Sequence, residues 1–172
     1  MTGAVIDRAL TARVERFLYR EARLLDEHDY GAWDALWTDD GVYWLPANGD
    51  GGDPETEMSI IYDNRSRIAL RVKQLLTGRR YAQEPRSRLR RIISNIEILT
   101  VAGNELTITS NSLVFESNPR GETIWAARND YRLRLHDDDD DDGDGDGALA
   151  MAFKKVTLAN NDKALYTLAF LM

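Results

Sequence analysis

The side chains best suited to acid–base chemistry in this 172-residue chain lie between positions 26 and 40. They are Asp26, His28, Asp29, Tyr30 and Asp40. Carboxylate, imidazole and phenol groups move protons in enzymes, so a pocket that gathered these residues would support a lyase or isomerase reaction. The same residue types also cap helix ends and fill tight connections, and we favour that structural role here.

The chain lacks most of the cysteine and histidine ligands that redox-metal sites need. The chain has no cysteine, which excludes disulfides, thiolate nucleophiles, zinc–thiolate sites and iron–sulfur clusters within it. Its two histidines are His28 and His136. A facial-triad iron site requires two histidines and a carboxylate in one place. These histidines stand at the end of an expected helix and beside an acidic turn, so we expect no shared metal site.

The sequence also lacks the motifs of nucleophilic hydrolysis, phosphate binding and nucleic-acid binding. The sequence contains no G-x-S-x-G elbow, no P-loop and no G-x-G-x-x-G fingerprint. The one basic run, "RSRLRR" at 86–91, has no interleaved aromatic residues. We interpret this run as a solvated strand start or a protein contact rather than a nucleic-acid patch.

An acidic stretch, "HDDDDDDGDGDGA" at 136–148, carries eight aspartates and therefore more than accounts for the net charge of −7. Without those eight charges the chain would carry +1. A calcium-loop register begins with Asp138, Asp140, Asp142 and Gly143, but Leu149 stands where a bidentate glutamate is needed. We predict an exposed hairpin loop over 137–147; an acidic arm for a basic partner remains the alternative.

Apolar spacing predicts the elements that would position these residues. Spacings of three, four and seven predict helices over 5–28, 30–37 and 59–76. Alternation and β-branched composition, clearest at 122–135, predict strands that are separated by short polar turns. The expected strands cover 42–46, 89–101, 105–117, 122–135, 149–160 and 164–171.

Helices followed by hairpin-linked strands predict an α+β fold, in which a curved antiparallel sheet wraps around the N-terminal helices as one domain over 1–172. Four aromatic residues, Trp33, Trp37, Tyr43 and Trp44, are expected in the core, with a ligand pocket as the alternative. The apolar end "LYTLAFLM" should be buried in the sheet or against another subunit. No signal-peptide pattern or membrane-length apolar run occurs, so a cytoplasmic location is expected.

Three stretches together resemble the beta, or small, subunit of bacterial aromatic-ring-hydroxylating dioxygenases. They are "FLYREARLLDEHDYGAWDALWTDDGVYWLP" at 17–46, "IYDNRSRIALRVKQLLTGRRYAQEPRSRLRRIISNIEI" at 61–98 and "KKVTLANNDKALYTLAFLM" at 154–172. The resemblance implies a nuclear-transport-factor-2-like (cystatin-like) cone, which agrees with the predicted order of elements.

The resemblance also implies a division of labour. An alpha subunit would carry the Rieske 2Fe–2S cluster and the mononuclear iron, and reductase proteins would supply electrons from NADH. The beta subunit would be a structural partner without catalytic, cofactor-binding or metal-binding residues. It would form trimers and, with alpha, an alpha3beta3 hexamer active in aromatic hydrocarbon catabolism; the ring substrate is not readable from this chain.

One position separates this chain from a catalytic relative of the same cone. Ketosteroid isomerases place their general-base aspartate immediately before a proline, and the matching stretch here, "TDDGVYWLP", has Leu45 at that position. A leucine side chain cannot accept a proton. This difference favours the structural subunit, and a stand-alone cone-fold lyase or isomerase with an Asp/His/Tyr pocket is the rival hypothesis.

Overall fold

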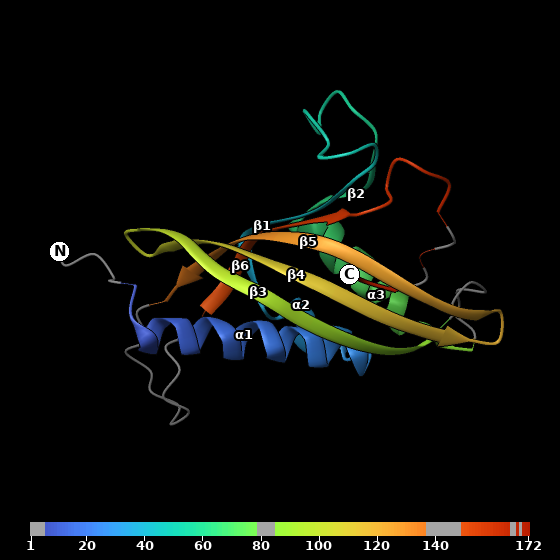
Figure 1. The fold of residues 1–172 in the computed structure, drawn as a ribbon, viewed down its shortest axis with the longest axis horizontal. Helices are drawn as coiled ribbons and strands as arrows, with labels where there is room; N and C mark the ends of the chain where they lie inside the picture. Colours follow the sequence, from blue (N-terminus) through green and yellow to red (C-terminus); the bar gives the residue numbers. More distant parts are fainter. Residues whose placement is uncertain (1–5, 79–84, 137–148, 166–167, 169) are drawn as a thin grey trace.

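One curved six-stranded sheet dominates the computed structural model, which describes residues 6–78, 85–136, 149–165, 168 and 170–172 (Figure 1). The strands lie side by side in the order β2-β1-β6-β5-β4-β3. Their bounds are Trp37–Pro46 (β1), Ser59–Asn64 (β2), Arg88–Ala102 (β3), Glu105–Asn118 (β4), Gly121–Leu135 (β5) and Leu149–Leu158 (β6).

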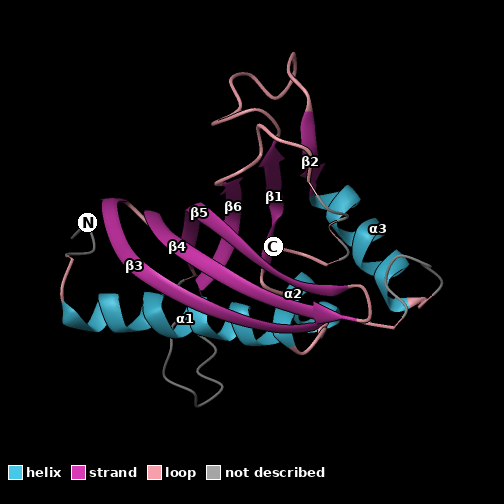
Figure 2. Cartoon of the chain, turned by 45° about the vertical axis from the view of Figure 1, so that its right-hand side comes forward, coloured by secondary structure: helices cyan, strands magenta, loops and turns pink. Residues whose placement is uncertain are grey.

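The sheet is antiparallel except where β1 lies parallel to β6. That parallel pair differs from the all-antiparallel expectation, and it arises because β6 returns to the middle of the sheet beside the first strand. Register shifts interrupt the β3–β4 ladder between Ser94 and Glu97 and the β5–β6 ladder at Arg132. Such irregularities bend strands, and the long strands β3, β4 and β5 curve over the first helix in Figure 2. The predicted α+β cone is confirmed.

The three helices are α1 (Arg8–Asp26), α2 (Tyr30–Asp34) and α3 (Arg65–Leu76). Each begins where a side-chain oxygen accepts a backbone N–H bond: Asp7 from Leu10, Asp29 from Ala32, and Asn64 from Arg67. Helix α1 lies along β3 and turns its apolar stripe inward (Figure 2). Its buried residues are Leu10, Val14, Phe17, Leu18, Glu21, Leu24 and Leu25.

The helix predicted over 59–76 is wrong in its first six residues, which form β2. Ile61 and Asp63 are buried while Ile60 and Asn64 are exposed, which is the two-residue period of a strand. The backbone pairs with β1, and Leu45 lies opposite Ile61. Because Ile61 and Ile68 are also seven residues apart, the apolar spacing alone fitted one long helix.

One other predicted helix end and one predicted strand are also wrong. The helix predicted over 30–37 ends at Asp34, and β1 begins at Trp37, because Trp37 pairs with Met151 of β6. The described residues of 164–171 contain no strand. There, the backbone of Leu171 bonds the Arg91 side chain instead of a neighbouring strand. The expected loop at 137–147 lies outside the described residues.

Candidate functional site

A buried glutamate marks the centre of the cone, between the helices and the inner face of the sheet. Glu21 of α1 is 2% exposed, although it stands on the apolar face of that helix. Lys154 of β6 donates to Glu21 Oε1 through Nζ at 2.6 Å, and Tyr131 of β5 donates its hydroxyl to Oε2 at 2.9 Å. The Trp33 indole N–H of α2 also donates to Oε1, at 3.2 Å. One carboxylate thus ties α1 and α2 to two strands.

Residues 170–172 fill the space beside this carboxylate. The Met172 carbonyl accepts bonds from Lys154 Nζ at 2.8 Å and from the Tyr43 hydroxyl at 3.0 Å. The Met172 N–H donates back to the same hydroxyl at 3.0 Å. All three residues, Phe170, Leu171 and Met172, are buried, which confirms the predicted burial for this part of the apolar stretch.

Phe170 is held between an arginine and a tryptophan. The Arg91 guanidinium lies 5.6 Å from the Phe170 ring centroid, and the Trp125 ring meets it edge to face at 6.0 Å. Arg91 also donates to the Leu171 carbonyl and forms a 2.5 Å ion pair with Asp26 of α1. These contacts anchor the segment by both its backbone and its aromatic side chain.

Burial shifts the protonation equilibria of this network. It lowers the pKa of Lys154, which the neighbouring Glu21 carboxylate partly opposes. Burial, reinforced by Glu21, raises the pKa of Tyr131 well above its ordinary value, and burial raises that of Tyr43 as well. Both phenols therefore remain protonated donors at neutral pH. Since Glu21 already accepts three bonds and residues 170–172 occupy the adjacent space, the network is saturated rather than poised for a substrate.

All four residues of the predicted aromatic core are buried, and three of them lie in the central cluster. The rings of Trp33, Trp37 and Tyr43 contact one another with centroid separations of 5.4 to 6.0 Å, and all three are buried. Trp44 points to the other face of β1, where its ring meets Tyr62 and the Lys155 ammonium. Leu45, the residue before Pro46, is completely buried.

Two members of the 26–40 group do meet. The His28 Nδ1 lies 2.7 Å from the Tyr30 hydroxyl, and its Nε2 lies 2.9 Å from the Ser87 carbonyl. A carbonyl can only accept, so Nε2 carries the proton and Nδ1 of the neutral ring accepts from Tyr30. Both ring nitrogens are therefore used: Nε2 joins the end of α1 to the residue before β3, and Nδ1 joins it to α2.

The other members of the group have separate partners. Asp26 bonds Arg91, and Asp29 caps α2. Asp40 accepts bonds from Arg134 and Thr38, which hold the pKa of its carboxyl well below the ordinary value. An exposed aspartate with a lowered pKa is a weak base and therefore a poor general base. Asp26 and His28 line one cleft of about 550 Å³, but Asp29, Tyr30 and Asp40 do not, so the five residues do not form one acid–base pocket.

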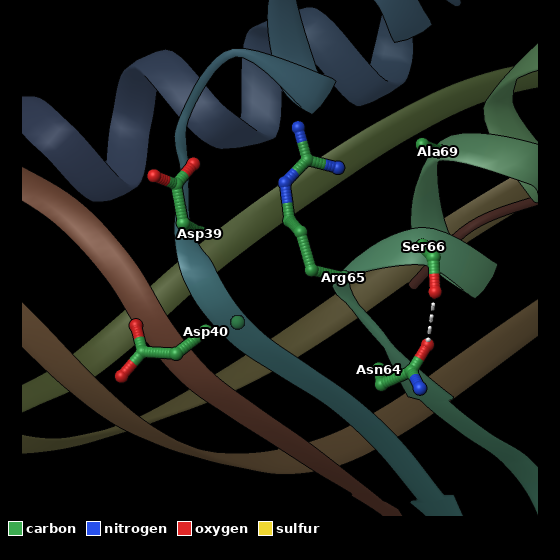
Figure 3. Close-up of a pocket in the computed structure, with 7 residues that line it drawn as sticks. Asp39, Asp40, Asn64, Arg65, Ser66 and Ala69 are labelled. Atoms are coloured by element: carbon green, nitrogen blue, oxygen red, sulfur yellow. Dashed lines mark hydrogen bonds between the residues drawn. The ribbon is translucent and has the colours of Figure 1, made fainter.

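A surface cleft of about 560 Å³ lies beside Asp40 (Figure 3). Asp39 and Asp40 of β1 stand on one side, and Arg65 and Ser66 of α3 stand on the other. Its polar groups hold the fold together: Arg65 pairs with Asp34 at 2.7 Å, and Ser66 bonds Asn64 at 3.0 Å. The cleft contains no pair of groups arranged for proton transfer.

The two histidines lie apart. His28 contacts Ser87 at the start of β3, whereas His136 is exposed and follows the last residue of β5, at the opposite end of the sheet. Among the described residues, no group of three or more histidine, aspartate or glutamate side chains could hold a metal ion. Within the same residues, no helix is both long and apolar enough to cross a membrane.

Sequence reasoning missed Glu21, Tyr131 and Lys154. Two of them carry a signal in the sequence, because each interrupts an apolar pattern with a charge. Glu21 falls on the apolar stripe of α1, and Lys154 falls on the buried alternation of β6. Charged residues are almost never fully buried unless they are paired, so two such interruptions indicate a buried ion pair.

Comparisons with known proteins agree with this architecture. Residues 20–142 match the family model for the ring hydroxylating beta subunit. The chain is 32% identical over 128 residues to the small oxygenase component of the p-cumate 2,3-dioxygenase system of Pseudomonas putida, covering 73% of this chain and 71% of that protein. It is 40% identical over 91 residues to the toluate 1,2-dioxygenase subunit beta of the same species, covering 50% of this chain and 56% of that one.

A solved structure extends the similarity to nearly the whole chain. The beta subunit of benzoate 1,2-dioxygenase from Burkholderia mallei superposes with a TM-score of 0.74 and 27% sequence identity. The match covers 98% of this chain and 99% of that one. The resemblance in the sequence is confirmed by relatives in both sequence and structure.

Proposed function

The chain belongs to the ring-hydroxylating beta subunit family, and we propose that it is the structural, non-catalytic subunit of a multicomponent aromatic-ring-hydroxylating dioxygenase. The observation that carries this proposal is the closed interior of the cone. The space beside Glu21 that a substrate would need holds Phe170, Leu171 and Met172. The cone therefore serves as a packed body that supports a partner.

The oxygen chemistry belongs to an alpha subunit in this proposal. That subunit carries the Rieske 2Fe–2S cluster and the mononuclear iron, and it receives electrons from NADH through reductase proteins. This chain supplies no catalytic, cofactor-binding or metal-binding residue. The absence of cysteine and the separation of His28 from His136 support this assignment.

Assembly completes the proposal. The subunit forms a trimer and combines with three alpha subunits into an alpha3beta3 hexamer in the cytoplasm, where the complex acts in the breakdown of aromatic compounds. The exposed apolar side chains on the outer face of the sheet support an assembled state, since contiguous exposed apolar surface marks protein contacts.

Reconstitution tests the proposed role. The chain is purified alone and, separately, with the alpha subunit encoded by a neighbouring reading frame that contains paired Cys-x-His and Cys-x-x-His motifs. We expect iron, and hydroxylation of an aromatic acid with NADH and reductase, only in the complex. Stoichiometric iron in the isolated chain would contradict the proposal. Turnover by the isolated chain without iron would support the rival lyase or isomerase.

A further inference from the structure

Four apolar side chains form an exposed patch on the outer face of the sheet. Ile92 is 65% exposed, Leu113 48%, Phe115 42% and Ile124 67%. Ile92 lies opposite Leu113 across the β3–β4 ladder, and Phe115 lies opposite Ile124 across the β4–β5 ladder, so the four are direct neighbours. Single exposed apolar residues are ordinary, but a contiguous group marks an interaction surface. We call these four residues the outer patch.

An arginine-lined cleft adjoins the outer patch. Arg86, Arg88 and Arg90 line a cleft of about 550 Å³ that also includes Phe115, His28 and Asp26, whose carboxylate is paired with Arg91. In the described part of the chain, no carboxylate lies within 4.0 Å of these three guanidinium groups; Arg90 bonds only the Leu89 carbonyl, at 2.8 Å. The outer patch thus has an unpaired cationic rim, the arrangement of an interface with an acidic partner surface.

The same molecule presents a complementary acidic surface. The β1–β2 loop, residues 47–58, carries four exposed carboxylates and an exposed Met58. Described basic residues form no ion pair with any of these carboxylates. The four are Asp50, Asp53, Glu55 and Glu57.

The β1–β2 loop is held in a defined shape. Asn161, which is 7% exposed, donates to the carbonyls of Pro46 and Gly49 and accepts from the Gly49 N–H. Gly51 has a φ of +65°, and a Cβ there would lie 2.3 Å from the Pro46 Cβ, so no other residue fits without a backbone shift. A pre-ordered loop loses little conformational entropy on binding, as a docking element should.

We propose that the β1–β2 loop of one copy docks into the arginine-lined cleft and onto the outer patch of a second copy. The inference rests on the proposed trimer and names its contact surface. Figure 1 shows the loop projecting beyond the sheet, away from the end where β3 begins, so loop and cleft belong to different sides of one molecule. A contact between two different surfaces is head-to-tail, and repetition of such a contact closes a three-membered ring when each copy is rotated by a third of a turn from the last.

Charge also favours this arrangement over a symmetric pairing of two outer patches. A two-fold contact would bring the same surface of both copies together. Arg86, Arg88 and Arg90 would then face their own counterparts, and like charges oppose association. The acidic loop instead gives these arginines carboxylate partners and places Met58 against apolar side chains.

Charge reversal of the full-length chain tests the contact. The cleft variant is Arg86→Glu with Arg88→Glu, and the loop variant is Asp50→Arg with Glu55→Arg. The control, Arg67→Glu with Lys73→Glu, makes the same charge change as the cleft variant on exposed positions of α3. Sedimentation velocity over a concentration series measures self-association, and circular dichroism confirms that each variant is folded.

We expect each of the two variants to weaken self-association by about 100-fold, because each places like charges face to face. The control should associate like the unmodified chain. A chain carrying all four substitutions has an acidic cleft and a basic loop, so it should regain much of the lost affinity. Recovery of this kind requires that the two surfaces touch, which a nonspecific loss of stability would not produce.

Three results would overturn the inference. If both variants form trimers at the unmodified affinity, another surface makes the contact and the proposed trimer stands. If they form trimers normally but lose binding to the alpha subunit, the surface belongs to alpha. If the unmodified chain is monomeric at micromolar concentration, the trimer itself fails, while the iron and turnover measurements still decide the subunit role.

Discussion

The two faces of the sheet treat charge in opposite ways. On the inner face, Glu21 and Lys154 are paired at 2.6 Å and each is almost fully buried. On the outer face, Arg86 and Arg88 are exposed and have no carboxylate partner among the described residues. A buried charge must be paired within the chain, because no solvent is available to it. The inner pair is thus complete in one molecule. On the outer face some charges, such as Asp40 and Arg134, also pair within the chain, whereas Arg86 and Arg88 would gain carboxylate partners in the proposed contact.

The largest test of this comparison removes one half of the buried pair. Glu21→Ala should lower the free energy of unfolding by about 3–5 kcal/mol, because it leaves the Lys154 charge without its partner. Equilibrium unfolding in urea measures the change. Glu27→Ala, an exposed carboxylate near the same helix end, should change it by less than about 0.5 kcal/mol. Equal losses of stability for Glu21→Ala and Glu27→Ala would contradict the inference that the buried Glu21–Lys154 pair stabilises the fold.

A second test compares two phenylalanines of unequal burial. Phe170→Ala should cost about 3–5 kcal/mol, since Phe170 is 4% exposed and packs against Trp125 and Arg91. Phe115→Ala, at 42% exposure, should cost about 1 kcal/mol or less in folding. Thermal unfolding at low protein concentration measures both. A larger loss of stability for Phe115→Ala than for Phe170→Ala would contradict the assignment of Phe170 to the core and of Phe115 to an exposed contact surface.

The third test uses alkaline pH. Burial raises the pKa of Tyr43, of Tyr131 and of Tyr30, so the folded chain keeps protons that the unfolded chain releases above about pH 10. Stability should therefore fall as pH rises above 10, by up to about 1.4 kcal/mol per pH unit for each tyrosine. Burial lowers the pKa of Lys154 from its ordinary value of 10.5. Between the lowered pKa and pH 10.5 the unfolded chain holds a proton that the folded chain has released, so this group makes stability rise with pH in that range.

Urea unfolding at a series of pH values measures this slope, and Tyr43→Phe is the matched variant. Loss of the Tyr43 hydroxyl should remove the Tyr43 share of the alkaline slope and leave the share of the other tyrosines whose pKa is raised. Ultraviolet titration should show the Tyr43 and Tyr131 phenols ionising only as the chain unfolds. Ionisation of all the tyrosines near pH 10 in the folded protein would be incompatible with the buried network.

The smallest expected effect belongs to an exposed ion pair. Asp40 accepts two bonds from Arg134 at 2.9 and 3.1 Å, which is good geometry in an exposed setting. Asp40→Asn should cost less than about 1 kcal/mol and still less at high salt, because solvent and ions screen the pair. Urea unfolding at two salt concentrations measures it. A loss as large as that of Glu21→Ala would erase the contrast between the two faces.

The spacing of apolar residues predicted the secondary structure well where that spacing fitted only one kind of element. The alternation of Trp125, Ala127, Tyr131 and Leu133 placed β5 correctly, because only a strand buries every second residue. It failed at Ile61 and Ile68, whose spacing suits both a helix and a strand followed by a helix. Pairing with β1 decided that case, and such pairing is a long-range property absent from any local window.

The candidate site was harder to predict for the same reason. His28 and Tyr30 are near in sequence and do meet, but the tie to Ser87 spans 59 positions. The partners of Glu21 lie on β5 and β6, so its role depends on the closed sheet. Local sequence therefore indicated a capping role such as that of Asp29, but it could not indicate the network. A charge on an apolar stripe was the only available signal.

The buried Glu21–Lys154 pair also limits when α1 can complete its contacts during synthesis of the chain. Glu21 and Lys154 are separated by 133 positions in the chain. At a synthesis rate of roughly 5–20 residues per second, Glu21 leaves the ribosome on the order of ten seconds before its partner exists. During that interval α1 carries a carboxylate on the apolar face that must later be buried, and it cannot dock in its final position. Helix α1 can therefore complete the buried hydrogen bonds of Glu21 only after β6 has been made.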